Sequence, residues 1–239
     1  MRKRIFHLTI GLLFLLPGVA PFALAGEVID GIVATVNRQP LFQSDWEEAI
    51  CFEAFMQQKP IAQVTQADRV KALQRLIDRQ LLQAQMGNKT FLQPSPDDIE
   101  KDVAKLRVQV PNGDDDGSWQ KLLASYGLTP DILKAHLLTE VRVMNFVEVR
   151  LRPNVHVQPE EIEAYYKSQL LPDLKKDGGK VIALDEVAPR IRELLVQQRM
   201  DEMLDAWLHN LRQQAEIHST IPIPAEAAVA EQNRASGTN

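Results

Sequence analysis

The sequence contains very little cysteine, and this shortage limits how the fold can be held together. Cys51 is the single cysteine among 239 residues, so no disulfide can form within the chain. The protein must therefore depend on its hydrophobic core for stability. Cys51 lies in an apolar stretch with Ile50, Phe52 and Phe55. A buried, inert thiol is the expected state there, and a reactive thiol is the alternative.

Motifs of the common enzyme classes are also absent. The sequence contains no G-x-S-x-G, no phosphate-binding P-loop and no G-x-G-x-x-G dinucleotide fingerprint. No two histidines form H-x-x-x-H or H-E-x-x-H, which leaves a zinc site without support. We therefore expect no catalytic residue, no cofactor-binding residue and no metal ligand.

One acidic loop has part of a calcium-binding pattern. The N-G-D-D-D-G run at residues 112–117 matches positions 1, 3, 5 and 6 of an EF-hand loop. Position 12 of such a loop is a bidentate glutamate, and Leu123 occupies it here. We therefore expect a solvated turn that caps a helix beginning near Ser118.

The first 25 residues have the pattern of a cleavable export signal. Basic residues at positions 2–4 precede an apolar run over 5–19, and Ala23-Leu24-Ala25 forms an A-x-A cleavage site. A retained membrane anchor is the alternative. Pro17 and Pro21 oppose it, because a membrane span needs roughly 20 continuous apolar residues. The pattern predicts cleavage near Ala25, a periplasmic location and no stable membrane insertion afterwards.

The mature chain is acidic. Cleavage removes three cations and leaves 24 Lys and Arg against 32 Asp and Glu, a formal charge of −8. This charge disfavours nucleic acid and anionic lipid surfaces as partners. The mature length allows one large domain or two small ones.

Helix-start signals recur along the mature chain and predict a mainly α-helical fold. The S-x-x-E motif at Ser44 is a capping box, and a similar start lies at Thr65. Ser95 and Thr129 each precede a proline at the first helical position. Gln158 precedes proline and two glutamates, which suit the positive end of a helix dipole.

Apolar residues spaced three or four apart support these helices. The first stripe, over 65–87, ends at Gly87 or Asn88, which suits a helix C-cap. The second, over 185–215, implies a helix of about 30 residues and roughly 45 Å, long enough to span the molecule and contact several segments. The stripes consist of Val70, Leu73, Ile77, Leu81 and Ala84, and of Ile191, Leu194, Leu195, Met203, Leu204, Trp207, Leu208 and Leu211.

The segment 141–151 is compatible with two structures. Its final part, Val147 to Leu151, alternates with a period of two, which suggests a strand. The preceding residues suit a helix. We expect one helix to about residue 150, followed by an extended exit through Pro153.

Two short β-branched runs lie at opposite ends of the mature chain. The run 32–36 is followed by a turn over 37–40 that leads directly into the helix at Ser44. A lone strand leaves its backbone hydrogen bonds unsatisfied, so it needs a partner. Residues 216–221 alternate in the same way and end at Pro222. We predict that 216–221 pairs with 31–36, which would close the two ends on each other.

Several motifs, in this order, resemble the SurA family of periplasmic chaperones. Residues 30–46, D-G-I-V-A-T-V-N-R-Q-P-L-F-Q-S-D-W, resemble the opening of that family, where a short strand ending in V-N leads into the first helix. Later segments resemble its second helix, a later helix, the helix leading out of the core and the long C-terminal helix: 76–82, 127–129, 157–166, 184–187, 191–192 and 208–212.

This resemblance implies a multi-helix core of the trigger-factor/SurA peptide-binding type, with a small β-ribbon and a long C-terminal helix. The chaperone domain that it implies, 26–221, lies between the predicted signal at 1–25 and a tail at 222–239, which its richness in Ala, Glu, Gln and Ser predicts to be disordered. Within the domain, 26–171 is the N-terminal helical part and 184–221 holds the long helix and closing strand. Relatives carry one or two parvulin-type isomerase domains of about 100 residues between these parts. Here a turn-rich link, 172–183, replaces them.

The function implied by the resemblance is that of an ATP-independent chaperone without its isomerase. Its partners would be unfolded or nascent exported proteins, including outer-membrane β-barrel precursors. Two alternatives stay open: a peptidyl-prolyl isomerase, and a structural or adaptor module that forms a dimer by exchanging its long helix.

Large apolar side chains on two predicted helices are the candidate client-binding residues. Rings and thioethers adapt to many apolar sequences, although the same side chains could simply fill the core. Pairing of a client with the edge of the terminal sheet would be a second binding mode. The candidates are Trp46, Phe52, Phe55, Met56, Trp119, Leu122, Leu123 and Tyr126.

Overall fold

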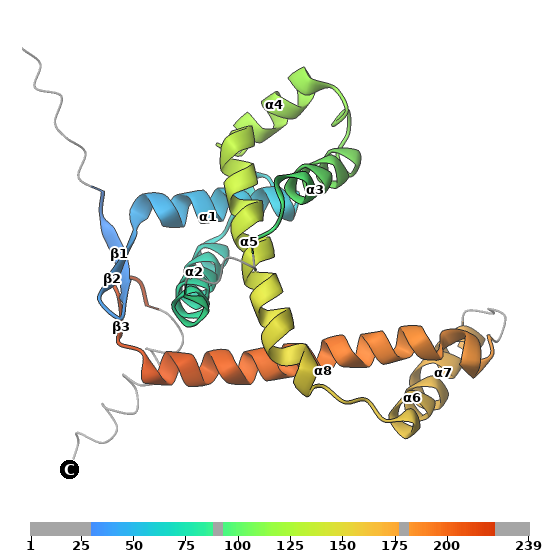
Figure 1. Ribbon diagram of the computed structural model, residues 1–239. Helices are drawn as coiled ribbons and strands as arrows, with labels where there is room; N and C mark the ends of the chain where they lie inside the picture. Colours follow the sequence, from blue (N-terminus) through green and yellow to red (C-terminus); the bar gives the residue numbers. More distant parts are fainter. Residues whose placement is uncertain (1–29, 88–92, 177–181, 223–239) are drawn as a thin grey trace, which may run out of the picture.

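The computed structural model describes residues 30–87, 93–176 and 182–222 (Figure 1). The predicted export signal with its cleavage site, and the tail beyond Pro222, lie outside these residues. The elements in chain order are β1 (Ile32–Val36), β2 (Gln39–Phe42), α1 (Gln43–Met56), η1 (Ile61–Gln63), α2 (Gln66–Met86), α3 (Pro96–Val108), α4 (Asp116–Ser125), α5 (Pro130–Leu151), η3 (Arg152–Asn154), α6 (Pro159–Tyr165), η4 (Tyr166–Leu170), α7 (Leu171–Lys176), α8 (Leu184–Gln214) and β3 (Ile217–Ser219). The prediction of a mainly α-helical fold with a small terminal sheet and a long C-terminal helix is confirmed.

The sheet joins the two ends of the described chain. Its strand order is β2-β1-β3, and both pairs are antiparallel. Ala34 lies opposite Ser219 and Val36 lies opposite Ile217. The backbone N–H of Thr220 also donates to the carbonyl of Val33 at 2.9 Å. The predicted pairing of 31–36 with 216–221 is therefore confirmed.

The prediction that residues 37–40 form a turn leading straight into a helix is wrong. Only Asn37 and Arg38 form the turn, with φ values of 50° and 66°, which suit a tight two-residue hairpin. A second strand, β2, follows before the helix. Pro40 obscured this strand in the sequence, but β2 is an edge strand, where a missing N–H is tolerated.

The predicted start of α1 at Ser44 is also wrong. The helix begins at Gln43, and Asp45 Oδ2 accepts the backbone N–H of Phe42 at 3.1 Å. Ser44 instead donates its backbone N–H, at 3.2 Å, and its hydroxyl to the carboxylate of Asp30. The predicted capping box was placed two residues too far along the chain. Asp45, and not Glu47, accepts the backbone N–H of the N-cap residue.

The other predicted helix starts are confirmed. Thr65, Ser95 and Thr129 are the N-caps of α2, α3 and α5, and each accepts a backbone N–H from the first turn. Gln158 is the N-cap of α6. The 112–117 loop does lead into a capped helix, but α4 begins at Asp116, with Asp115 accepting the N–H of Ser118 at 2.7 Å. Gly87, at φ 57°, ends α2.

The strand alternative for 147–151 is wrong, because α5 continues to Leu151. The alternating apolar residues do not share one buried face, because Leu151 is buried, Val147 is partly buried and Val149 is 57% exposed. A 3₁₀ turn over Arg152–Asn154 then starts the exit through Pro153.

The link expected over 172–183 begins later than predicted. After α6 the chain forms a π-helical turn, η4, and then α7, which extends to Lys176. Leu170 and Leu171 pack against a small core of Ile162, Tyr166, Val187 and Ile191, and this contact keeps the segment helical. Residues 177–181 lie outside the described part of the chain.

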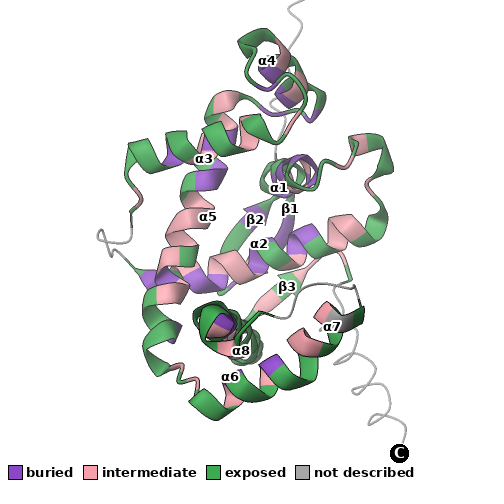
Figure 2. Cartoon of the chain, turned by 90° about the vertical axis from the view of Figure 1, so that its right-hand side faces the viewer, coloured by how far each residue is buried: buried purple, intermediate pink, exposed green. Residues whose placement is uncertain are grey.

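The long helix α8 connects separate hydrophobic clusters, as its length predicted. It contacts α6 through the small core and contacts α2 and α5 further along. Figure 1 shows it running from α6 and α7 to the sheet, with α5 crossing it. Figure 2 shows how little of α6 and α8 is buried compared with β1 and α2. None of the described helices combines the length and hydropathy that crossing a membrane requires.

Candidate functional site

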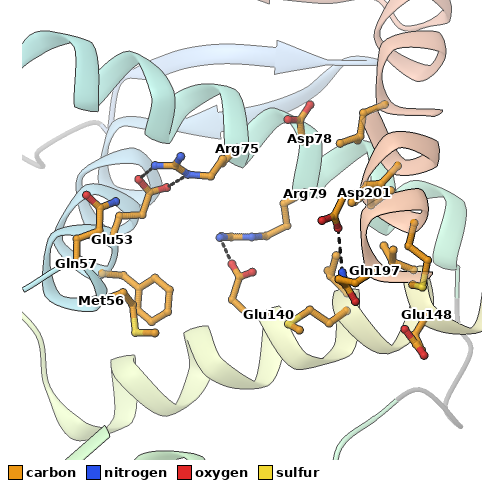
Figure 3. A pocket seen from close by; sticks show the side chains of 18 residues that line it. Glu53, Met56, Gln57, Arg75, Asp78, Arg79, Glu140, Glu148, Gln197 and Asp201 are labelled. Atoms are coloured by element: carbon orange, nitrogen blue, oxygen red, sulfur yellow. Dashed lines mark hydrogen bonds and ion pairs between the residues drawn. The ribbon is translucent and has the colours of Figure 1, made fainter. Parts of the chain in front are cut away.

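An open groove with a volume of about 520 Å³ lies between α1, α2, α5 and α8. Figure 3 shows α1 and α8 on opposite sides of it, with α2 and α5 forming the other two walls. These helices lie far apart in the sequence, so the groove exists only because the tertiary fold brings them together.

The walls of the groove are largely apolar and rich in methionine. Met56 on α1 and Met144 on α5 are 43% and 67% exposed, whereas Met200 on α8 is buried. Thioether side chains are flexible and polarisable, so they fit apolar groups of different shapes. The other apolar lining residues are Phe52, Leu82, Val143, Val147, Leu204 and Leu208.

Ion pairs on the α2 side neutralise the charges there. Arg75 donates from Nε to Glu53 of α1 at 2.6 Å, and a second, short bond completes a two-pronged pair. The hydrogen bond to Glu53 raises the pKa of Arg75, which therefore stays charged. Arg79 forms an ion pair with Glu140 of α5. These pairs connect α2 to α1 and, across the groove, to α5.

Two further contacts position the walls on either side of α5. Phe52 of α1 stacks on His136 of α5 with ring centroids 4.6 Å apart, and His136 Nε2 lies 2.7 Å from Glu48 Oε1. On the other side, Phe146 of α5 lies 5.7 Å from Trp207 of α8, measured between ring centroids. Packed aromatic groups thus hold the walls together, alongside the ion pairs that connect α2 to α1 and α5.

The predicted client-binding residues occupy three different environments. Trp46 is buried in the cluster formed by the sheet, α1 and α2. Phe52 and Met56 line the groove, and Met56 is the exposed one of the two. The remaining residues belong to the cluster of α1, α3, α4 and α5, in which Leu122 is partly buried and the others are buried: Phe55, Trp119, Leu122, Leu123 and Tyr126.

Contacts within that second cluster are specific. Phe55 meets Trp119 and Tyr126 edge to face, at centroid distances of 5.8 and 5.6 Å. Such pairs add about 0.5–1.5 kcal/mol beyond burial. The cluster therefore anchors the short helix α4 on α1.

Sequence reasoning did not select the groove residues of α5 and α8. Leu204 and Leu208 belong to the predicted apolar stripe of the long helix, so that signal was present. Met144 and Met200 lie outside the predicted stripes. Only the packing of α8 across α5 and α2 makes them neighbours.

Other candidate chemistry is weak among the described residues. No group of three or more His, Cys, Asp or Glu in that part of the chain could hold a metal ion. Burial, followed by the charge of Glu47, raises the pKa of the Cys51 thiol. A raised pKa leaves little thiolate at neutral pH, so Cys51 is a poor nucleophile.

Comparison with protein families gives one match. The model described as the SurA-like N-terminal domain matches residues 2–146, which is more than half of the chain. The match includes β1 to α4 and most of α5, so it contains three of the four groove walls. No isomerase domain was found alongside it. Among curated proteins, none matches this chain.

Proposed function

We propose that this chain, which belongs to the family of SurA-like N-terminal domains, is an ATP-independent chaperone that holds unfolded envelope proteins in the periplasm. Family membership indicates a chaperone-like role in binding unfolded proteins, and the family is typically periplasmic. The specific clients proposed are outer-membrane β-barrel precursors. The chaperone domain is proposed to comprise residues 26–221.

The observation that carries this proposal is the methionine-rich groove between α1, α2, α5 and α8. An unfolded client offers extended apolar segments of many sequences. A site for them must accept different shapes, and flexible thioethers provide this tolerance. Exposed Met56 and Met144 stand on two adjoining walls, α1 and α5, so a segment lying in the groove would contact both.

The groove also suits binding without nucleotide. The sequence contains no P-loop, so hydrophobic contact must supply the affinity and client folding must supply the release. Of the residues predicted from sequence, Phe52 and Met56 form part of the proposed site. The others are proposed to act through the core that holds α1 and α4 in place.

The test compares aggregation of an unfolded outer-membrane β-barrel protein with and without this chain. The wild-type chain should suppress aggregation, and a variant with Met56→Gln and Met144→Gln should bind the client about tenfold more weakly. This estimate assumes a loss of about 0.5–1 kcal/mol of apolar contact at each methionine. Both side chains are exposed, so thermal unfolding should be nearly unchanged.

Val149→Gln is the matched control. Val149 is an exposed apolar residue on the same helix as Met144, but it does not line the groove. It should leave suppression intact. Equal aggregation with and without the wild-type chain would contradict the proposal, and so would full suppression by the double variant. A proline-limited refolding assay run in parallel should show no rate enhancement; acceleration would instead support the isomerase alternative.

A further inference from the structure

We infer that the groove prefers apolar client segments that carry a lysine or arginine beside the apolar core, and that Asp201 of α8 receives this cation. The inference rests on the proposed function and names the class of segment that the groove would select. It follows from an uneven distribution of charge along the groove.

Five carboxylates and two guanidinium groups line the groove. On the α1 and α2 side, each carboxylate has its own cation. Glu53 pairs with Arg75, and Asp78 pairs with Arg212. Arg79 pairs with Glu140, which lies across the groove on α5. This side therefore presents no net charge to a bound segment.

The α5 and α8 side lacks such balance. Glu148 shares Arg152 with Glu193, at 2.8 and 2.6 Å, so one cation serves two carboxylates. Asp201 has no ion pair with any residue that the structure describes. It accepts a hydrogen bond from the neutral amide of Gln197 at 2.9 Å.

Asp201 is placed to meet a bound chain. Figure 3 shows it on the α8 wall, beside Gln197 and opposite Glu53, Met56 and Gln57 of the α1 wall. It is exposed, so it keeps its water until a ligand arrives, and it neighbours Met200 in the apolar lining. A segment whose apolar side chains contact the methionines would bring an adjacent lysine or arginine within reach of this carboxylate.

The test uses fluorescent ten-residue peptides with one fixed core of Leu, Phe and Tyr. The flanking position is Lys, Gln or Glu, and binding is measured by anisotropy at low salt. The Lys peptide should bind about two- to fivefold more tightly than the Gln peptide, which is the range that an exposed ion pair contributes. The Glu peptide should bind most weakly. Raising the salt to about 0.5 M should remove most of the difference, because ions screen exposed charges.

Two variants separate a local contact from the attraction of an acidic protein for any cation. Asp201→Asn should abolish the preference for Lys, so that the Lys and Gln peptides bind with equal affinity. Glu202→Gln removes the same charge from the next residue of α8, which does not line the groove, and should keep the preference.

The outcomes also distinguish this inference from the proposed function. If all three peptides bind equally, and Met144→Gln weakens them all, the groove binds clients but the charge preference is wrong. If both charge variants lose the preference equally, the contact with Asp201 is wrong. If no peptide binds to the wild-type chain, the proposed function itself fails.

Discussion

At the scale of single residues, the two residues of the hairpin turn between β1 and β2 have a strained backbone, and one of them also bonds to the other end of the chain. The backbone of both Asn37 and Arg38 has a positive φ. Apart from glycine, and to a lesser degree Asn and Asp, residues rarely adopt this conformation. Asn37 also reaches the other end of the chain. Its N–H donates to the carbonyl of Glu216 at 2.8 Å, and its Oδ1 accepts the N–H of Glu216 at 3.0 Å.

Substitutions at these two adjacent positions should therefore have opposite effects. Arg38→Gly creates an Asn-Gly turn and should raise the free energy of unfolding by about 0.5 kcal/mol, because glycine adopts positive φ without strain. Asn37→Ala should lower it by about 1–2 kcal/mol, since it removes a hydrogen bond and adds strain. Urea denaturation measures both. A destabilised Arg38→Gly protein, or a neutral Asn37→Ala protein, would contradict this account of the turn.

Residue patterns predicted roles that depend on neighbouring residues better than roles that depend on contacts with distant segments. Thr65, Ser95 and Thr129 were identifiable as caps because a cap depends on the three residues that follow it. Trp119 and Tyr126 were chosen as binding candidates for their size, but α1, α3 and α5 cover them. Met144 was not chosen, because its place in the groove depends on α8, some 60 positions away in the chain. Burial of this kind is a property of packing and leaves no local signal.

At the scale of elements, several helices begin with a carboxylate that accepts hydrogen bonds. The pKa of Asp68 in α2 is lowered by hydrogen bonds first from Lys59 and then from Thr65. Ser95 lowers the pKa of Asp98 in α3, and the backbone N–H of Ser118 lowers that of Asp115 before α4. The backbone N–H of Gln158, and then Arg199, lower the pKa of Glu161 in α6. Ionised carboxylates thus stabilise the N-terminal ends of four helices.

These helix starts should make stability sensitive to acid. A carboxyl whose pKa is lower in the folded state than in the unfolded chain stabilises the fold above the unfolded pKa, near 4. That contribution is lost as the pH falls through the lower, folded pKa. The combined variant Asp68→Asn, Asp98→Asn, Asp115→Asn and Glu161→Gln should therefore unfold at a lower temperature than the wild type at pH 7.

The difference between the two melting temperatures should shrink as the pH falls from about 4 to about 2, where the wild-type carboxyls also become neutral. Circular dichroism of thermal unfolding at several pH values measures it. A difference that stays constant over this range would show that these carboxylates contribute nothing through their charge.

Elements were predictable where several local signals agreed. They were missed where a local residue argued against the element or where the packing partners come later in the chain. The helix α2 was identified from its stripe, its cap and its terminal glycine together. The strand β2 was missed because Pro40 argues against a strand, and only its position at a sheet edge makes proline acceptable. The helix α7 was missed because its apolar partners, Val187 and Ile191, come later in the chain.

At the scale of the whole molecule, the two ends of the chain stabilise each other. The cluster beneath the sheet contains Val33 and Val36 of β1 with residues of α1 and α2. Leu211 of α8 and Ile217 of β3 pack against it from the other end of the chain. Arg212 also pairs with Asp78 of α2, a carboxylate that is only 15% exposed. The groove wall formed by α8 is therefore fixed at the end next to the sheet.

This arrangement predicts that loosening β3 also loosens β1 and the final turns of α8. Thr220→Pro removes the N–H that donates to Val33 and should lower the free energy of unfolding by about 1–3 kcal/mol. Thr220→Val keeps that N–H and the branched shape, and serves as the control. Hydrogen exchange of peptides covering 31–37 and 208–219 should speed up together in the proline variant and stay slow in the valine variant.

The same variant connects the sheet to client binding. If the closing strand holds α8 in place, loosening it lets the α8 wall move away from Met56 and Met144, and the proline variant should suppress client aggregation less well at a temperature where it is still folded. Faster exchange confined to 216–221, with β1 and the end of α8 unchanged, would show that the two ends open independently. The groove would then owe its shape to the contacts of α8 with α2 and α5 alone.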